Sequence, residues 1–341
     1  MKKKVLITGA TGQTGSYLVD YLLENEKEWE IHCTRRWRSN EEHILHFRDN
    51  VTWHSCEMKD YFNVFNVIKK IMPEKIFLYS ASSFVRDSWL QPQAYLEENV
   101  SHLLNVMNSI LMLNEIDLDS LKVKLKYNPK IFIALSSEEY GKVEWGTKIT
   151  EETPLNPVSP YGVSKVAVDL LAKQYFESYG LNVYRLRMFN NESERRGHIF
   201  VTASFIKQVV LMERNLIEPV LHVGDTSSVR DWLPSSDAAR AAWIGLDKCK
   251  PGEVYNVCSE IQHSIDEFIE RLRELTTVDF TLKVDDNRIR PSDVKWLAGD
   301  CSKFKKITDW SPKHDFLKDT VPEMLKYWRM KIAKENKKEK T

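Results

Sequence analysis

The first half of the chain alternates short apolar runs with longer amphipathic stretches. Five runs have the length and composition of strands, at 5–7, 29–33, 51–53, 75–79 and 131–135. Between them, apolar residues spaced three or four apart predict helices at 16–25, 60–71 and 93–114. Strands that alternate with helices pair in parallel through right-handed crossovers. We therefore predict an α/β fold built on a doubly wound parallel sheet.

The second half continues this pattern only briefly. A helix at 161–179 leads into a strand at 183–187, after which the predicted helices are separated by short strands and polar loops, at 200–214, 235–247, 264–275 and 316–334. We expect a sheet domain over 1–187, to which about 221–258 returns, and a smaller α/β lobe over 188–335. Residues 115–129 resemble a surface insertion, and the charged end 336–341 is expected to fray.

Composition narrows the class of protein. Lys and Arg number 49, as do Asp and Glu, so the net charge is zero, which argues against a nucleic-acid partner. The longest apolar runs are too short to span a membrane. Five scattered cysteines, none spaced C-x-x-C, indicate a reducing compartment, and we expect a cytoplasmic protein. His43 and His46 have no third ligand nearby in sequence, so we expect no metal site.

Three of the chain's 12 glycines fall in one seven-residue window, Gly9–Gly15. The window follows the first predicted strand and opens a helix, which is the context of a Rossmann-type dinucleotide site. Without a Cβ, the backbone can turn tightly and approach a pyrophosphate, whose charge meets the helix N-terminal amides. The alternative is a turn whose glycines serve packing alone. The expected cofactor-binding residues here are Gly9, Thr11, Gly12, Gln13, Thr14 and Gly15.

The end of the second predicted strand bears on the choice of dinucleotide. An NAD site usually places an acid about 20 residues after the glycines, where it holds the ribose 2′-hydroxyl. Here Arg35 and Arg36 occupy that region, and the first acid is Glu41. Guanidinium groups suit a 2′-phosphate, so we predict NADP, with NAD as the less favoured cofactor. The alternative is an exposed basic loop, or one that contacts a neighbouring subunit.

A candidate proton-transfer pair begins the helix at 161–179. Tyr161 and Lys165 are four residues apart and share a helix face, so the ammonium is expected to lower the pKa of the phenol and make it a proton acceptor. Such a pair also occurs by chance. Its significance rises because Ser136 and Glu138 stand at the carboxyl end of a predicted strand, where open α/β sheets bind ligands.

Together these residues resemble the extended short-chain dehydrogenase/reductase family, from residue 4 to about residue 312. Within it the chain is most similar to the GDP-mannose 4,6-dehydratases. Asn190–Thr202 resembles their N-H-E-S-P-R-R-G-x-x-F-V-T segment, which is more specific than the glycine motif. Val229–Trp232, Arg290–Val294 and Gly299-Asp300 fit the same template.

The resemblance implies a redox-neutral dehydration with Ser136, Glu138, Tyr161 and Lys165 as catalytic residues. Tyr161, assisted by Lys165 and Ser136, would accept the proton of the sugar's 4-hydroxyl while the nicotinamide takes hydride from C4. The resulting ketone acidifies C5, where Glu138 would remove a proton before water leaves C6 and the hydride returns there. Ser137 stands where dTDP-glucose relatives have Asp, so Glu138 must also assist the leaving hydroxyl. Such a carboxylate should sit in a dry pocket.

The resemblance also implies binding residues and an assembly. Substrate would be held by Ser137, Asn190, Arg230 and Arg290. The cofactor would further contact Arg35, Arg36, Glu57, Met58, Ala81, Ser82, Tyr161, Lys165 and Arg196. Pairing through the helices at 93–114 and 161–179 implies a homodimer, and the 35–40 loop is a second contact that would make a homotetramer.

Several residues depart from the family pattern. Asn191 replaces a histidine and Glu194 a proline, and Ala203-Ser204 replaces an Arg-Lys pair, which removes two cations near the expected substrate. The sugar therefore stays open between a GDP-linked hexose and a heptose. The main hypothesis is an NADP-dependent dehydratase acting on a nucleotide sugar. The alternatives are an NADPH-dependent 4-keto-sugar reductase or epimerase on the same scaffold and, from another class, a non-catalytic NADP-binding sensor.

Overall fold

A computed structural model describes residues 2–338 except 118, 290–291 and 293. Its centre is a seven-stranded sheet in the order β12-β8-β7-β4-β1-β2-β3, and every neighbouring pair is parallel. This confirms the predicted fold class. The strands are β1 (Lys3–Thr8), β2 (Trp29–Arg35), β3 (Thr52–Ser55), β4 (Lys75–Leu78), β7 (Lys130–Ser136), β8 (Val183–Met188) and β12 (Val254–Val257).

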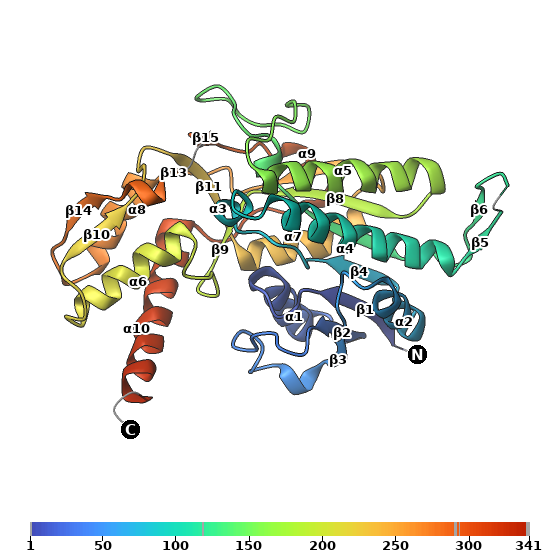
Figure 1. Ribbon diagram of the computed structural model, residues 1–341, viewed down its shortest axis with the longest axis horizontal. Coiled ribbons are helices and arrows are strands. Elements are labelled where there is room, and N and C mark those ends of the chain that lie inside the picture. Colours follow the sequence, from blue (N-terminus) through green and yellow to red (C-terminus); the bar gives the residue numbers. More distant parts are fainter. Residues whose placement is uncertain (1, 118, 290–291, 293, 339–341) are drawn as a thin grey trace.

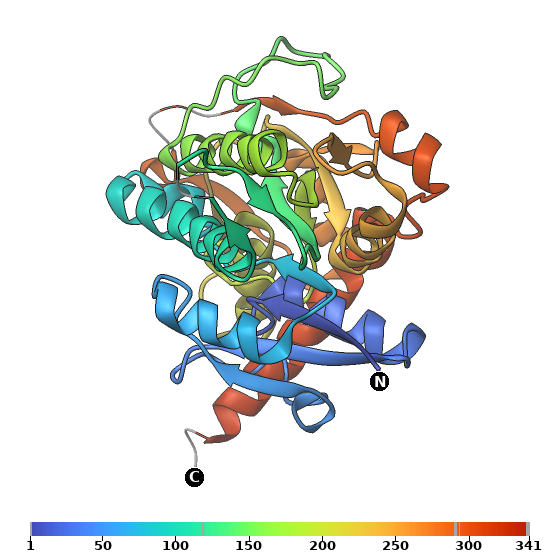
Figure 2. The ribbon, with the colours of Figure 1, turned by 90° about the vertical axis from the view of Figure 1, so that its right-hand side faces the viewer.

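Helices cover both faces of this sheet (Figure 2). The strands are apolar on both faces, as β1 shows. Its side chains point alternately to the two faces of the sheet, so that Val5 and Ile7 join one apolar cluster and Leu6 joins another. Leu18 of α1 and Trp243 of α7 complete the first cluster. The second is completed by α2, α4 and α5. The bounds of these helices are α1 Gln13–Asn25, α2 Tyr61–Ile71, α4 Pro92–Met112, α5 Pro160–Tyr179 and α7 Ser235–Lys248.

A smaller lobe lies to one side of the sheet, at the left in Figure 1. Its own apolar core includes Phe205, Trp232, Phe268 and Phe316. β10 and β14 pair in parallel, and β11 pairs with β9, β13 and β15. The lobe elements are β9 (Asn190–Glu192), α6 (Val201–Glu213), β10 (Val220–Val223), β11 (Val229–Pro234), β13 (Gln262–Ser264), α8 (Ile265–Leu275), β14 (Thr281–Val284), β15 (Trp296–Leu297), the π-helical turn η4 (Phe316–Thr320) and α10 (Val321–Lys338).

The chain crosses between the two parts more than once. Within the segment 221–258, β12 is an edge strand of the central sheet and α7 packs against that sheet. β10 and β11 lie outside it. α9 (Ser302–Thr308) then packs on α7 and β12. α10 continues through Lys338, so it includes the first residues of the charged end, and 339–341 lie outside the described residues.

Short elements complete the fold. The expected insertion forms a projecting hairpin of β5 (Glu115–Ile116) and β6 (Val123–Lys124), visible at the right of Figure 1. The other short helices are η1 (Arg48–Asn50), α3 (Val85–Ser88), η2 (Ser137–Glu139) and η3 (Asp286–Arg288). Among the described residues, no helix combines the length and apolar composition that crossing a bilayer requires.

Candidate active site

The glycine-rich turn joins β1 to α1 at the carboxyl edge of the sheet. Gly9 has a φ of +68°, and a Cβ there would lie 2.8 Å from the Ser80 amide nitrogen. A Cβ on Gly15 would lie 2.4 Å from the Gly9 carbonyl oxygen. The turn therefore needs glycine both to curve and to pack against the end of β4. It leaves the first amides of α1 at the edge of a cavity, which suits an anionic ligand.

The end of β7 places the Ser136–Glu139 segment beside that turn. Ser136 caps the 3₁₀ turn η2, because its hydroxyl accepts the Glu138 N–H at 3.2 Å. In return, the Glu139 carboxylate accepts the Ser136 N–H at 2.8 Å. This reciprocal capping box fixes the backbone that carries Ser136 and Glu138. Both side chains are more than nine-tenths buried, as expected for a carboxylate shielded from water.

The start of α5 supplies the tyrosine and lysine. Ser159 accepts the Gly162 N–H at 3.0 Å, and Pro160 occupies the first helical position, so the sequence itself defines where the helix begins. Tyr161 and Lys165 then face the same cavity from successive turns. The Lys165 ammonium lies 6.0 Å from the centre of the Tyr161 ring and donates to the Ala134 carbonyl at 2.9 Å.

The expected lowering of the Tyr161 pKa is wrong for this arrangement. Burial raises the pKa of the Tyr161 phenol, and hydrogen bonding with Ser136 opposes that rise without cancelling it. Burial also lowers the pKa of Lys165 to about 8, while the Glu139 charge acts in the opposite direction. Desolvation therefore sets the direction of the Tyr161 pKa shift, and the Glu138 and Glu139 charges add to it.

The four candidate catalytic residues line one cavity of about 380 Å³. The same cavity is lined by other residues singled out in the sequence, namely Gly9, Gly12, Gln13, Thr14, Gly15, Ala81, Ser137, Asn190, Arg196 and Arg230. A second cavity of about 270 Å³ shares Gly9, Gly12 and Ala81 with the first and is also lined by Thr11, Arg35, Arg36, Glu57, Met58 and Ser82. The two form one groove over the strand ends. Arg290 lies outside the described residues.

The two arginines after β2 differ in their surroundings. Arg35 forms an ion pair with Glu41, and its guanidinium lies 5.3 Å from the centre of the Trp53 ring. Arg36 makes no ion pair with any other described residue and lines the groove. Arg36 therefore has the cation that is available to a 2′-phosphate, whereas Arg35 is already neutralised.

Several buried polar atoms in the groove lack a hydrogen-bond partner among the described residues. They include the side-chain oxygens of Asn190, Asn191 and Ser228 and the Nε of Arg196. Such atoms are costly unless a ligand or water satisfies them. Together with the Cβ-free turn at Gly9, they fit a dinucleotide and a second polar ligand bound end to end in the groove.

Some cavity residues escaped the sequence reasoning. Arg288, in η3 beyond β14, lines the cavity, where its Nη1 donates to the Ser204 hydroxyl at 3.2 Å and its Nε lies 3.4 Å from the Asp285 carboxylate. It therefore places a cation beside the position where the family lysine is missing. Phe84 and Phe200 form an edge-to-face pair in the cavity wall, and the Arg196 guanidinium lies 3.5 Å from the centre of the Phe200 ring. Of these residues, only Arg288 has a signal in the sequence, because it precedes Arg290 in an R-x-R-P motif.

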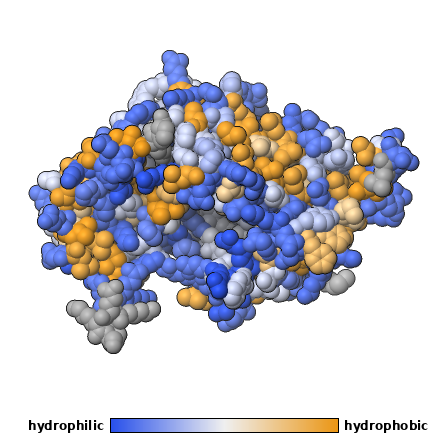
Figure 3. All heavy atoms as spheres, in the orientation of Figure 1, coloured by the Kyte–Doolittle hydropathy of each residue, from blue (hydrophilic) through white to orange (hydrophobic). Residues whose placement is uncertain are grey.

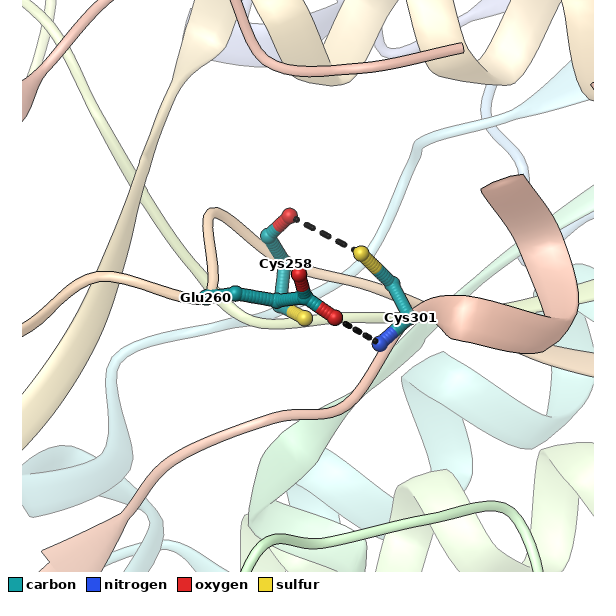
Figure 4. A group of neighbouring side chains, drawn as sticks. All are labelled: Cys258, Glu260 and Cys301. Carbon is teal, nitrogen blue, oxygen red and sulfur yellow. Dashed lines mark hydrogen bonds between the residues drawn. The ribbon is translucent and has the colours of Figure 1, made fainter. Parts of the chain in front are cut away.

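A second cluster of chemically versatile side chains lies outside the groove (Figure 4). Ligand atoms of Cys258, Glu260 and Cys301 lie within 4.8 Å of one another. Burial raises the pKa of the Cys258 thiol, Cys301 donates to the Cys258 carbonyl, and Glu260 is paired with Lys305 at 2.6 Å. A Cβ on Gly299 would lie 2.7 Å from the Cys258 sulfur, so the cluster is tightly packed. We interpret it as a structural tie between β12 and α9.

Comparisons with known proteins agree with this geometry. The family model described as GDP-mannose 4,6 dehydratase matches residues 6–324. A GDP-mannose 4,6-dehydratase of Vibrio cholerae is 29% identical over 92% of this chain and 90% of that protein. GDP-mannose 4,6 dehydratase 2 of Arabidopsis thaliana is 31% identical over 98% of this chain and 89% of its own.

Solved structures share the fold. RMD from Pseudomonas aeruginosa, complexed with NADPH, superposes with a TM-score of 0.80 at 23% identity, covering 97% of this chain and 99% of that one. A UDP-glucuronic acid 4-epimerase from Bacillus cereus, in complex with UDP-glucuronic acid and NAD, gives a TM-score of 0.81 at 22% identity, covering 96% of this chain and 99% of that one. With a family model that spans nearly its whole length, this chain belongs to the GDP-mannose 4,6-dehydratase family.

Proposed function

We propose that this protein is an NADP-dependent sugar-nucleotide 4,6-dehydratase that converts a GDP-mannose-like sugar into its 4-keto-6-deoxy derivative. One observation carries the proposal, namely the convergence of Ser136, Glu138, Tyr161 and Lys165 in a single cavity that opens onto the glycine turn. The names of the relatives support the same reaction.

NADP⁺, when bound, supplies the reversible hydride acceptor that takes hydride from C4 and returns it at C6. The glycine turn would hold its pyrophosphate through the amides at the start of α1. Arg36 would bind the 2′-phosphate, and the backbone around Met58 would lie against the adenine. Arg196, whose Nε is buried without a hydrogen bond among the described residues, would complete the site.

The remaining steps are proton transfers by the protein's own side chains. The Tyr161 oxygen, hydrogen bonded to Ser136, would accept the proton of the 4-hydroxyl as a phenolate. Burial raises the pKa of Tyr161, so the phenolate would need the nearby Lys165 ammonium and the positive charge of an oxidised nicotinamide, when bound, to stabilise it. Glu138 then removes the proton at C5, which the adjacent ketone has acidified. Because Ser137 carries no carboxylate, Glu138 is also the acid that protonates the departing 6-hydroxyl.

The other end of the cavity would bind the nucleotide diphosphate. Arg230 is buried there and Asn190 has a buried amide oxygen aimed at no described partner, so both suit a bound polar ligand. Arg290 would add a further anion contact. Arg288 would supply the cation that Ser204 lacks, beside the diphosphate or base. Its planar fork suits bidentate recognition of phosphate or a guanine edge.

We further propose that the protein works in the cytoplasm as a homodimer or homotetramer. α4 and α5 pack side by side and expose Leu96, Val163 and Leu170, and Figure 3 shows apolar atoms gathered over this region. Such a patch is typical of a protein–protein interface. All five cysteines are free and buried, as suits a reducing compartment. A monomer by light scattering would contradict the assembly.

The reaction is tested with purified protein, GDP-mannose and a catalytic amount of NADP⁺. We expect a 4-keto-6-deoxy product without net NADPH. The Glu138→Gln variant should still oxidise C4, so that enzyme-bound NADPH fluorescence accumulates, but it should not release water. If product forms only with stoichiometric NADPH and an already oxidised sugar, the protein is a reductase instead.

A further inference from the structure

Glu192 is a buried carboxylate in the groove that the proposed mechanism does not use. Its side chain is 2% exposed, and it lines the same cavity as Tyr161. One carboxylate oxygen accepts a hydrogen bond from the Thr202 hydroxyl at 2.6 Å, and the other lies 3.6 Å from the Nε of Arg196. Burial raises the pKa of Glu192, while the Arg196 charge and the Thr202 hydrogen bond act against that rise. Glu192 and Arg196 therefore form an ion pair in the cavity wall.

Gln13 holds the same guanidinium from the other part of the molecule. Its side-chain oxygen accepts a hydrogen bond from the Nη1 of Arg196 at 3.0 Å. Gln13 is itself fixed, because its side-chain nitrogen donates to the Asn191 carbonyl at 3.1 Å and to the Ser235 hydroxyl at 2.8 Å. Since Gln13 begins α1 and Asn191 belongs to β9, these contacts join the glycine turn to the smaller lobe.

These contacts leave one nitrogen of Arg196 available to a ligand. Glu192 lies at Nε and Gln13 at Nη1, whereas Nη2 makes no hydrogen bond with any described residue. The guanidinium lies beside the turn whose amides suit a pyrophosphate. A charge-assisted donor that is already held in one direction binds phosphate oxygens well, because little side-chain freedom is lost on binding.

We propose that Gln13 and Glu192 are positioning residues that direct Arg196 toward the pyrophosphate of the bound dinucleotide. The inference rests on the proposed function, because it takes the ligand at the glycine turn to be NADP. It extends that function by making the smaller lobe, through Arg196, a part of the cofactor site.

A double-mutant cycle measures whether the Gln13 side chain acts through Arg196. Gln13→Met keeps the length of the side chain but removes its hydrogen bonds, and we expect it to weaken NADP⁺ binding about tenfold in equilibrium dialysis. In an Arg196→Met background, the same change should alter the dissociation constant by less than about twofold. Equal effects in the two backgrounds would show that Gln13 acts without Arg196 and would overturn the proposal.

Asp20→Asn is the matched control. Asp20 also lies on α1 and holds the neighbouring arginine, Arg195, at 2.6 Å, but neither residue lines the cavity that contains Tyr161. We expect this variant to bind NADP⁺ within about twofold of the wild type. An equal loss in Asp20→Asn and Gln13→Met would mean that any contact between α1 and the lobe has the same effect, which contradicts a role for Arg196.

A second ligand locates the effect within the cofactor. 2′-AMP carries the adenine and the 2′-phosphate but no pyrophosphate, so every variant should bind it as the wild type does. A parallel loss of 2′-AMP binding would place the effect elsewhere and refute the proposal.

Thr202→Val tests Glu192 without changing any charge or any residue of the cavity wall, because it removes only the hydroxyl that holds the carboxylate. It should weaken NADP⁺ binding about two- to fivefold, and unchanged binding would contradict the role of Glu192. Urea unfolding shows whether each variant is folded. Since none of these assays needs turnover, a wild type that binds NADP⁺ but leaves GDP-mannose unchanged refutes the proposed function alone.

Discussion

Replacement of Gly9 by alanine tests whether the turn after β1 needs glycine for its shape, for its packing or for both. Gly9 combines a φ of +68° with close neighbours, since a Cβ would lie 2.8 Å from the Ser80 nitrogen and 2.9 Å from the Tyr79 carbonyl carbon. Gly146 offers a matched control. Its φ is +84°, but a Cβ there would meet nothing within 4 Å.

Comparison of the two variants therefore separates the energetic cost of the left-handed backbone from the cost of crowding by neighbouring atoms. The left-handed backbone costs a non-glycine residue about 1 to 2 kcal/mol, and this applies to both positions. Crowding against backbone atoms adds about 1 to 3 kcal/mol at Gly9 alone. We expect Gly9→Ala to lose about 2 to 5 kcal/mol of stability and Gly146→Ala about 1 to 2 kcal/mol.

Urea unfolding of the protein alone, followed by tryptophan fluorescence, measures both losses. A titration with NADP⁺ then asks whether the displaced turn still binds a pyrophosphate, and we expect weaker binding in Gly9→Ala only. Equal stability of the two variants would refute the reasoning, because the contact with the end of β4 would then contribute nothing.

Three further predictions concern the groove. Tyr161→Phe should reduce turnover by about 10²- to 10⁴-fold, because the proton acceptor is lost, while equilibrium dialysis should show nearly unchanged NADP⁺ binding. Arg36→Ala should weaken NADP⁺ binding by about tenfold or more and leave NAD⁺ binding nearly unchanged, whereas Arg35→Ala should have the smaller effect, since Arg35 is paired with Glu41. Arg288→Gln should raise the dissociation constant of GDP in calorimetry, and Ser204→Lys in that background should restore binding. If Ser204→Lys has no effect, Arg288 does not replace the missing cation.

Local sequence patterns predicted most of the central sheet. The apolar runs at 5–7 and 131–135 lie within β1 and β7, and the helix expected at 161–179 is α5. No strand was predicted at β12 itself, although about 221–258 was expected to return to the sheet domain, because its place beside β8 depends on pairing between segments about 70 residues apart. Such long-range pairing is not encoded in a local period of apolar residues.

The candidate site was predictable where motif and strand end coincide. β7 ends and α5 begins at the same edge of the sheet. One cavity is therefore lined by Ser136, Glu138, Tyr161 and Lys165. Their electrostatics could not be predicted in the same way, since the pKa of Tyr161 follows its burial rather than its spacing from Lys165.

Other features depended on how the loops fold. Glu41 follows the second predicted strand at too great a distance in sequence to be expected at the ribose 2′-hydroxyl. In the structure, the loop folds back and pairs Glu41 with Arg35. Glu139 follows Glu138 directly in sequence and carried no prediction of its own, but the 3₁₀ turn directs it into the interior. Arg288 reaches the cavity only because β14 pairs with β10.

An isotope-transfer experiment tests the central claim most directly. GDP-mannose carrying deuterium at C4 is converted with catalytic NADP⁺, and the product is examined by mass spectrometry and NMR. If one tyrosine, one lysine, one serine and one glutamate act on a single bound sugar, the deuterium will appear at C6 of the product, and a solvent proton will be found at C5. Loss of the label to solvent or to free NADPH, or its retention at C4, would contradict the account.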